Sequence, residues 1–189
     1  MKLIRITAMA GAAAGMLAAP LSAQVDVQIG YINKMGDNPW FVAEVAGARE
    51  AAEEAGAEFT AHDVQFNADL TITTMDTMIS SGVDGIAIVV PDRSLGPVVA
   101  EKAEEAGIPL VAVDDDIYFE DDTQVPYVGM NARSIGESVG RKLAEIYKDE
   151  GWGDLPEEQV RIASVEDRKA DTCMQRNRGA EAAFLNAVP

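Results

Sequence analysis

The stretch I-P-L-V-A-V-D-D-D at residues 108–116 indicates the fold class of this chain. Its mostly apolar residues from Pro109 to Val113 predict a strand buried on both faces, and Asp114, Asp115 and Asp116 follow at once. In open α/β sheets, ligands bind at the carboxyl ends of the strands. Carboxylates at that edge form either a solvated acidic loop or a set of acceptors for the O–H groups of a polyhydroxyl ligand. The acidic run alone does not decide between these two interpretations.

A repeated strand–helix unit surrounds this stretch. Glycines at positions 56, 82 and 107 end three predicted helices at nearly equal intervals, and each interval holds one strand and one helix. The predicted strands are residues 27–32, 57–64, 85–90, 109–113 and 126–130. This order predicts a parallel, doubly wound α/β sheet with right-handed crossovers.

The sequence predicts fewer helices and strands in the C-terminal third of the chain. Ser134 can cap a helix, residues 160–165 read as a strand, and residues 173–188 read as a last helix. One strand cannot complete a sheet, so we expect residues 24–130 to form a first lobe and residues 131–189 to begin an incomplete second α/β lobe. The apolar face of the first of these helices would carry Ile135, Val139, Leu143 and Ile146.

The first 23 residues are typical of a secretory signal peptide. Lys2 and Arg5 precede an alanine-rich apolar run over residues 6–19, which Pro20 ends, and L-S-A at residues 21–23 offers a cleavage site after Ala23. The apolar run is short for a membrane span. We therefore expect an exported protein that is not inserted in the membrane.

Composition excludes several classes of site. A formal net charge of −17 argues against nucleic acid and anionic membrane surfaces as partners. With one cysteine, Cys173, and one histidine, His62, a disulfide scaffold or a zinc site is not expected. The loop after the first strand lacks the closely spaced glycines of a dinucleotide site. A Ca²⁺ site in the acidic run 114–122 is an alternative, although its spacing does not match an EF-hand loop.

Polar and aromatic side chains follow the predicted strands. Asp92 and Arg93 follow the third strand. Trp40 and Phe41 come after the first strand and could either pack on a sugar ring or hold their helix against the sheet. Cations, carboxylates, an amide and aromatic rings together are typical of a carbohydrate-binding site. The candidate binding residues are Lys34, Asn38, Trp40, Phe41, Asp114, Asp115, Met130 and Arg176.

From residue 27 to 189 the chain resembles the arabinose-binding group of the type I periplasmic sugar-binding proteins, which serve ABC importers. The resemblance rests on several stretches in matching order: K-M-G-D-N-P-W-F (34–41), V-A-V-D-D (111–115), V-P-Y-V-G-M (125–130), I-G-E (135–137), G-W (151–152) and D-T-C-M-Q-R-N-R-G (171–179). It implies two α/β lobes joined by a hinge, with a monosaccharide (L-arabinose or a related pentose or hexose) held between them. It further implies a non-catalytic periplasmic monomer that needs no cofactor or metal and delivers sugar to a permease in the inner membrane.

The resemblance also implies roles for individual residues. Lys34, Trp40 and Phe41 match the ligand contacts of the first loop, and Asp114 and Asp115 match paired aspartates beside the anomeric end of the sugar. Met130 matches an apolar contact at the hinge, and Arg176 matches the arginine of the second lobe. Asn38 departs from the pattern, because arabinose binders carry a glutamate there.

Two other functions are alternatives. The effector-binding lobe of a sugar-responsive transcriptional regulator has the same fold, but such regulators begin with a DNA-binding segment and not with an export signal. An enzyme could also use the aspartates on a doubly wound sheet. Adjacent strand residues point to opposite sides, however, which is poor geometry for paired acid–base catalysis.

Overall fold

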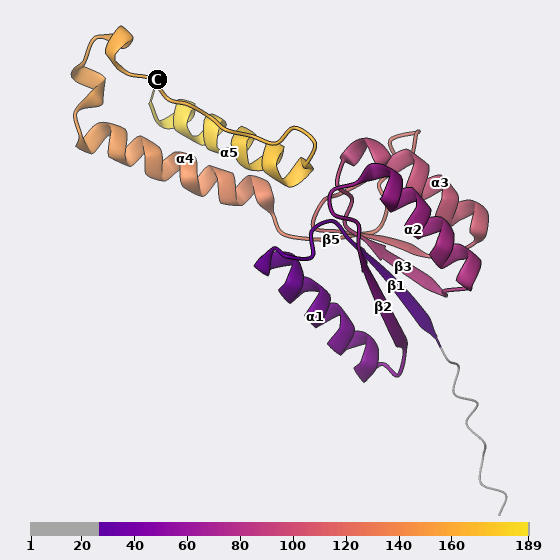
Figure 1. Cartoon of the computed structure of the whole chain (residues 1–189). Helices are drawn as coiled ribbons and strands as arrows, with labels where there is room; N and C mark the ends of the chain where they lie inside the picture. The colour runs from indigo at the N-terminus through magenta and orange to yellow at the C-terminus, as the bar shows by residue number, and fades with distance from the viewer. Residues whose placement is uncertain (1–26, 189) are drawn as a thin grey trace, which may run out of the picture.

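A five-stranded parallel sheet organises the chain (Figure 1). This computed structural model describes residues 27–188, so the predicted signal peptide at residues 1–23 lies outside the described residues. The sheet has the order β2-β1-β3-β4-β5, and every pairing is parallel. The strands are β1 (Gln28–Asn33), β2 (Glu58–Asp63), β3 (Gly85–Ile88), β4 (Leu110–Val113) and β5 (Tyr127–Val128). The predicted α/β class is therefore confirmed.

Helices cover both faces of the sheet (Figure 1). On one face, α2 (Ala68–Ser81) and α3 (Gly96–Ala106) pack a core that includes Ile32, Met75 and Val99, all fully buried. On the other face, α1 (Pro39–Glu54) packs through Phe41 against Tyr31 and Val89. Ile32 and Tyr31 are neighbours on one strand that face opposite cores, as expected for a sheet buried on both sides.

The helix ends follow from capping chemistry. Asn38 caps α1 ahead of Pro39, as the sequence predicts, and Gly82 and Gly107 end α2 and α3 in the left-handed conformation. The sequence allows Asp69 to cap α2, but Asn67 is the cap: its side chain accepts a hydrogen bond from the Leu70 amide, and Asp69 lies in the first turn. Because the strands are parallel and α1, α2 and α3 each follow one of them, the N-termini of these helices lie near the carboxyl ends of the strands.

The C-terminal third is a pair of helices, α4 (Ala132–Asp149) and α5 (Asp171–Ala187), which lie side by side away from the sheet (Figure 1). They approach closely because α4 presents glycines. A Cβ atom at Gly136 would lie 1.9 Å from the Arg176 carbonyl oxygen, and one at Gly140 would lie 2.1 Å from that of Ala180. The buried face of α4 is therefore its small residues, and not the predicted apolar row, of which Val139 is 57% exposed.

The predicted strand at residues 160–165 is wrong. Residues 160–166 have no regular structure, and Ile162 and Val165 are exposed. A strand needs a neighbour for its backbone hydrogen bonds, and the described chain provides no second sheet beside this segment.

Short 3-10 helices form at Arg93–Leu95, Trp152–Asp154 and Glu157–Gln159. The lobe boundary at residue 130 stays a prediction, and no helix within residues 27–188 is long and apolar enough to cross a bilayer.

Candidate functional site

A cavity of about 370 Å³ lies where the carboxyl ends of the strands meet the N-terminal half of α5. Its walls combine residues distant in sequence: the loop after β1, the first turn of α1, the turn after β4, and α5. Six of the eight predicted site residues line it: Lys34, Asn38, Trp40, Phe41, Asp114 and Arg176. Asp115 lies directly beneath it, and Met130 lines a neighbouring cavity.

A buried charge cluster forms the base of this cavity. The Lys34 ammonium donates to Asp115 Oδ2 and lies 3.7 Å from Asp114 Oδ2. The Lys34 and Asp115 side chains are only 5% and 1% exposed, and the ammonium also lies 4.9 Å from the Phe41 ring centroid. A buried cation needs such partners, because an uncompensated charge in the interior is costly. The cluster carries one positive and two negative formal charges.

Thr172 also lines the cavity, although the sequence did not indicate it as a site residue. Its amide and hydroxyl donate to Asp115 Oδ1 at 2.9 and 2.8 Å. Because Thr172 is in the first turn of α5, Asp115 joins the sheet to that helix, and both of its oxygens accept bonds within the protein. The quoted stretch 171–179 contains Thr172, but nothing in its pattern indicates a partner 57 residues away.

Asp114 differs from its neighbour in backbone and charge. Its φ of 61° is left-handed, and Tyr127 donates to its carbonyl oxygen at 2.8 Å. Burial, followed by the nearby Asp115 charge, raises the pKa of the Asp114 carboxyl, while Lys34 and Arg176 oppose the shift. Of the two aspartates in the cluster, Asp114 is the one that lines the cavity.

The α5 helix provides a cation to the same space. Arg176 lies one turn after Thr172, lines the cavity, and has Nη2 3.0 Å from Met130 Sδ. Met130 itself lines a second cavity of about 510 Å³ under α1. There the buried Tyr31 hydroxyl lies beside the Glu44 carboxylate, although neither the hydroxyl nor Glu44 Oε2 makes a hydrogen bond of regular geometry within residues 27–188. Burial raises the pKa of both Tyr31 and Glu44.

A second contact between the sheet and α5 lies beside Asp116. Asp116 Oδ2 accepts bonds from Tyr118 and Gln124, while Oδ1 is buried near the Asp171 carboxyl. Arg93 donates through its amide to the Lys169 carbonyl at 3.1 Å. Asp92 and Arg93, which follow β3, therefore contact the start of α5 and the segment ahead of it. Lys169 Nζ lies 3.7 Å from Asp92, and Arg93 Nη1 lies 3.9 Å from Asp171.

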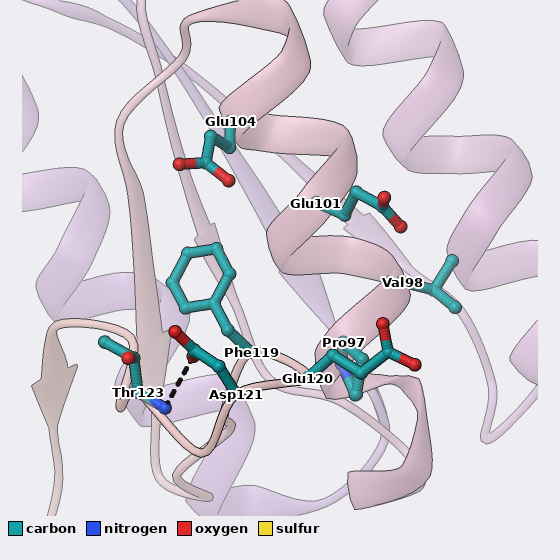
Figure 2. A pocket seen from close by; sticks show the side chains of 8 residues that line it. All are labelled: Pro97, Val98, Glu101, Glu104, Phe119, Glu120, Asp121 and Thr123. Carbon is teal, nitrogen blue, oxygen red and sulfur yellow. Dashed lines mark hydrogen bonds between the residues drawn. The ribbon is translucent and has the colours of Figure 1, made fainter.

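Figure 2 shows another cavity, of about 420 Å³, between α3 and the loop after β4. Glu101, Glu104, Glu120 and Asp121 surround Phe119 there, and no lysine or arginine of residues 27–188 lines it. Within residues 27–188, no three Asp, Glu, His or Cys side chains group as metal ligands would, so the Ca²⁺ alternative gains no support. The cavity with Lys34 and Arg176 is the better candidate because it offers both hydrogen-bond donors and acceptors.

Comparison with known proteins identifies the family of this chain. A family model described as a periplasmic binding protein domain matches residues 29–185. An L-arabinose-binding periplasmic protein of an Azospirillum brasilense ABC transporter is 30% identical over 171 residues, covering 86% of this chain and 48% of that protein. The L-arabinose-binding periplasmic protein of Escherichia coli K12 is 30% identical over 159 residues, covering 82% and 47%. The chain thus spans about half the length of these curated relatives.

Solved structures share the fold. A galactofuranose-binding protein superposes with a TM-score of 0.71 at 20% identity, covering 85% of this chain and 52% of the other. The arabinose-transporter binding protein of Shewanella sp. ANA-3, bound to L-arabinofuranose, gives a TM-score of 0.68 at 20% identity, covering 85% and 51%. With a matching sheet, a family model that spans most of the sequence and curated relatives at 30% identity, this chain belongs to the periplasmic binding protein family.

Proposed function

We propose that this chain is the sugar-binding part of an exported, non-catalytic receptor that captures a monosaccharide for an ABC importer. The observation that carries the proposal is the cavity itself, in which Asp114 from the sheet faces Arg176 from α5 with Trp40 beside them. A sugar hydroxyl can donate to Asp114 and accept from Arg176, and Trp40 offers an apolar ring, 51% exposed, for the C–H face of the sugar. The names of the curated relatives make L-arabinose the first ligand to test.

The two-sided construction of the site supports a closing mechanism. Asp114 follows β4 and the aromatic residues Trp40 and Phe41 lie in α1, whereas the arginine comes from α5, so a ligand in the gap contacts both the sheet-containing part and α5. Such binding favours the closed arrangement of two lobes over an open one. We propose that the closed form is what a permease in the inner membrane recognises, and that the signal peptide at residues 1–23 directs the protein to the periplasm.

The direct test is isothermal titration calorimetry of the protein at its natural full length with L-arabinose, D-galactose and D-glucose. We expect saturable 1:1 binding of at least one sugar, with no change in the sugar afterwards. Arg176→Ala should weaken that binding by about 10-fold or more, because a hydrogen bond to a charged group is worth about 1.5–3 kcal/mol. Arg161→Ala, outside the cavity, is the matched control and should bind as the wild type does.

Two results would refute the proposal. One is the absence of heat with all three sugars. The other is conversion of the sugar by the purified protein, which would favour the enzyme alternative. Cell fractionation separates the remaining alternative, because a transcriptional regulator would stay in the cytoplasm.

A further inference from the structure

Phe66 lies in the turn between β2 and α2 and lines the 370 Å³ cavity. Its side chain is 43% exposed and belongs to neither buried core of the sheet within residues 27–188. A large apolar side chain stabilises the fold in proportion to the area that folding removes from water, and much of this ring stays in water. The ring is therefore free to provide an apolar contact to a molecule that enters the cavity.

The backbone at this position is one that phenylalanine rarely adopts. Gln65 and Phe66 have φ angles of 50° and 58°, so two successive residues lie in the left-handed region. That conformation brings the Cβ atom too close to the following carbonyl oxygen, and glycine or asparagine is the usual choice there. Unfavourable backbone conformations of this kind concentrate at ligand-binding sites, where the surrounding structure holds them in place.

Hydrogen bonds of the backbone hold this turn. The Gln65 amide donates to Asp63 Oδ1 at 2.9 Å, and the Phe66 amide donates to the Lys34 carbonyl oxygen at 2.8 Å. The second bond joins the turn to the residue whose ammonium pairs with Asp115 in the buried charge cluster. Because both donors are backbone amides, the position of the turn does not depend on which side chain stands at position 66.

A monosaccharide offers more apolar surface than one aromatic side chain can cover. A sugar ring carries C–H groups on both of its faces, whereas the indole of Trp40 can pack against one face only. Asp114 and Arg176 serve the hydroxyl groups, so the second C–H face needs a different residue. Aromatic rings have the large, rigid apolar surface that such a contact requires.

We infer that Phe66 is a ligand-binding residue whose ring covers the C–H surface of a neutral monosaccharide that Trp40 leaves open. This inference rests on the proposed function, because it specifies one further contact of the same cavity. The left-handed turn places the ring at the cavity and keeps it out of the core, so the unfavourable backbone conformation serves binding and not folding.

Three substitutions at position 66 separate the ring from the backbone. Phe66→Ala removes the ring and keeps the Cβ atom that the left-handed conformation disfavours, whereas Phe66→Gly removes both. Phe66→Tyr keeps the aromatic surface. Leu70→Ala is the matched control, because Leu70 in the first turn of α2 is 39% exposed and is not among the described residues that line the cavity.

Binding is measured by calorimetry on the protein at its natural full length, with whichever of L-arabinose, D-galactose and D-glucose the wild type binds most tightly. We expect the affinity to fall about 3- to 10-fold in both Phe66→Ala and Phe66→Gly, because each loses the aromatic contact. Phe66→Tyr and Leu70→Ala should stay within about 2-fold of the wild type. In thermal melts without sugar, Phe66→Gly should unfold about 1–3 °C above Phe66→Ala, since glycine alone adopts the left-handed conformation without cost.

Three outcomes overturn the inference while sugar binding by the wild type leaves the proposed function standing. They are wild-type affinity in Phe66→Ala and Phe66→Gly, a loss in Phe66→Tyr as large as that in Phe66→Ala, and an equal loss in Leu70→Ala. A melting temperature of Phe66→Ala as high as that of Phe66→Gly would also contradict the backbone part of the inference. A wild type that binds none of the three sugars refutes the proposed function itself, so the two failures are distinguishable.

Discussion

Replacing Asp115 by alanine should destabilise the protein before any ligand is involved. The Lys34 ammonium would lose its closest counter-charge while its side chain stays 5% exposed, and Thr172 would lose the acceptor for its amide and hydroxyl. Breaking a buried ion pair by removing one partner costs about 3–5 kcal/mol. Asp114, 3.7 Å from the ammonium, offsets part of this loss, so we expect about 3 kcal/mol.

Asp114→Asn is the matched comparison. It removes one of two carboxylates around a single lysine, one whose pKa burial already raises, and asparagine tolerates the left-handed φ of 61°. We expect a change of less than about 1 kcal/mol in the free energy of unfolding. Urea denaturation of both variants at pH 7 without sugar measures the difference. The reasoning about the cluster is refuted if Asp115→Ala costs less than about 1 kcal/mol, or if Asp114→Asn costs as much.

Three further perturbations follow from the structure. The buried Tyr31 hydroxyl lies beside the Glu44 carboxylate but makes no hydrogen bond of regular geometry within residues 27–188, so Tyr31→Phe should change the free energy of unfolding by less than about 1 kcal/mol. A larger loss in urea denaturation would show that the hydroxyl is bonded to Glu44. Burial is the main cause, and the Asp116 carboxyl the next, of a raised pKa for the Asp171 carboxyl. The folded state therefore keeps this proton to a higher pH than the unfolded state does. Stability falls as the pH rises from the unfolded pKa of about 4 to the folded pKa. Asp171→Asn should therefore be more stable than the wild type at pH 7, and thermal melts should show this advantage shrinking toward pH 4. Gly136→Ala should destabilise the protein by disrupting the contact between α4 and α5. Gly47→Ala in α1, where the added methyl group meets open space, should instead raise the free energy of unfolding by about 0.5–1 kcal/mol. Equal melting temperatures for the two variants would contradict the close approach of α4 and α5.

Local sequence signals were sufficient for the sheet. Glycine C-caps, asparagine N-caps and short β-branched runs act over a few residues, and each agrees with the same strand–helix alternation. The parallel order then brings the ends of β1 and β4 to one edge, so Lys34 and Asp114 could be expected to meet there. That Lys34 and Asp114 lie together follows from this topology, whereas their binding role stays a prediction.

Long-range choices could not be read from local patterns. A periodic apolar row on α4 predicts burial, yet the row of Ile135, Val139 and Ile146 is exposed and the glycine row is buried. Two helices can approach most closely where side chains are smallest, and only the position of α5 reveals which row is used. The same limit applies to Thr172, whose bond to Asp115 depends on where the first turn of α5 lies relative to the end of β4.

Three consecutive aspartates have three different environments because the chain turns between them. Asp114, in the left-handed conformation, faces the cavity with Arg176; Asp115 is buried between Lys34 and Thr172; and Asp116 lies beside Tyr118 and the Asp171 carboxyl. An extended backbone would instead alternate the side chains, with Asp114 and Asp116 on one face and Asp115 on the other. The left-handed residue thus directs one carboxylate toward the cavity, while the other two contact the first turn of α5, the helix that carries Arg176.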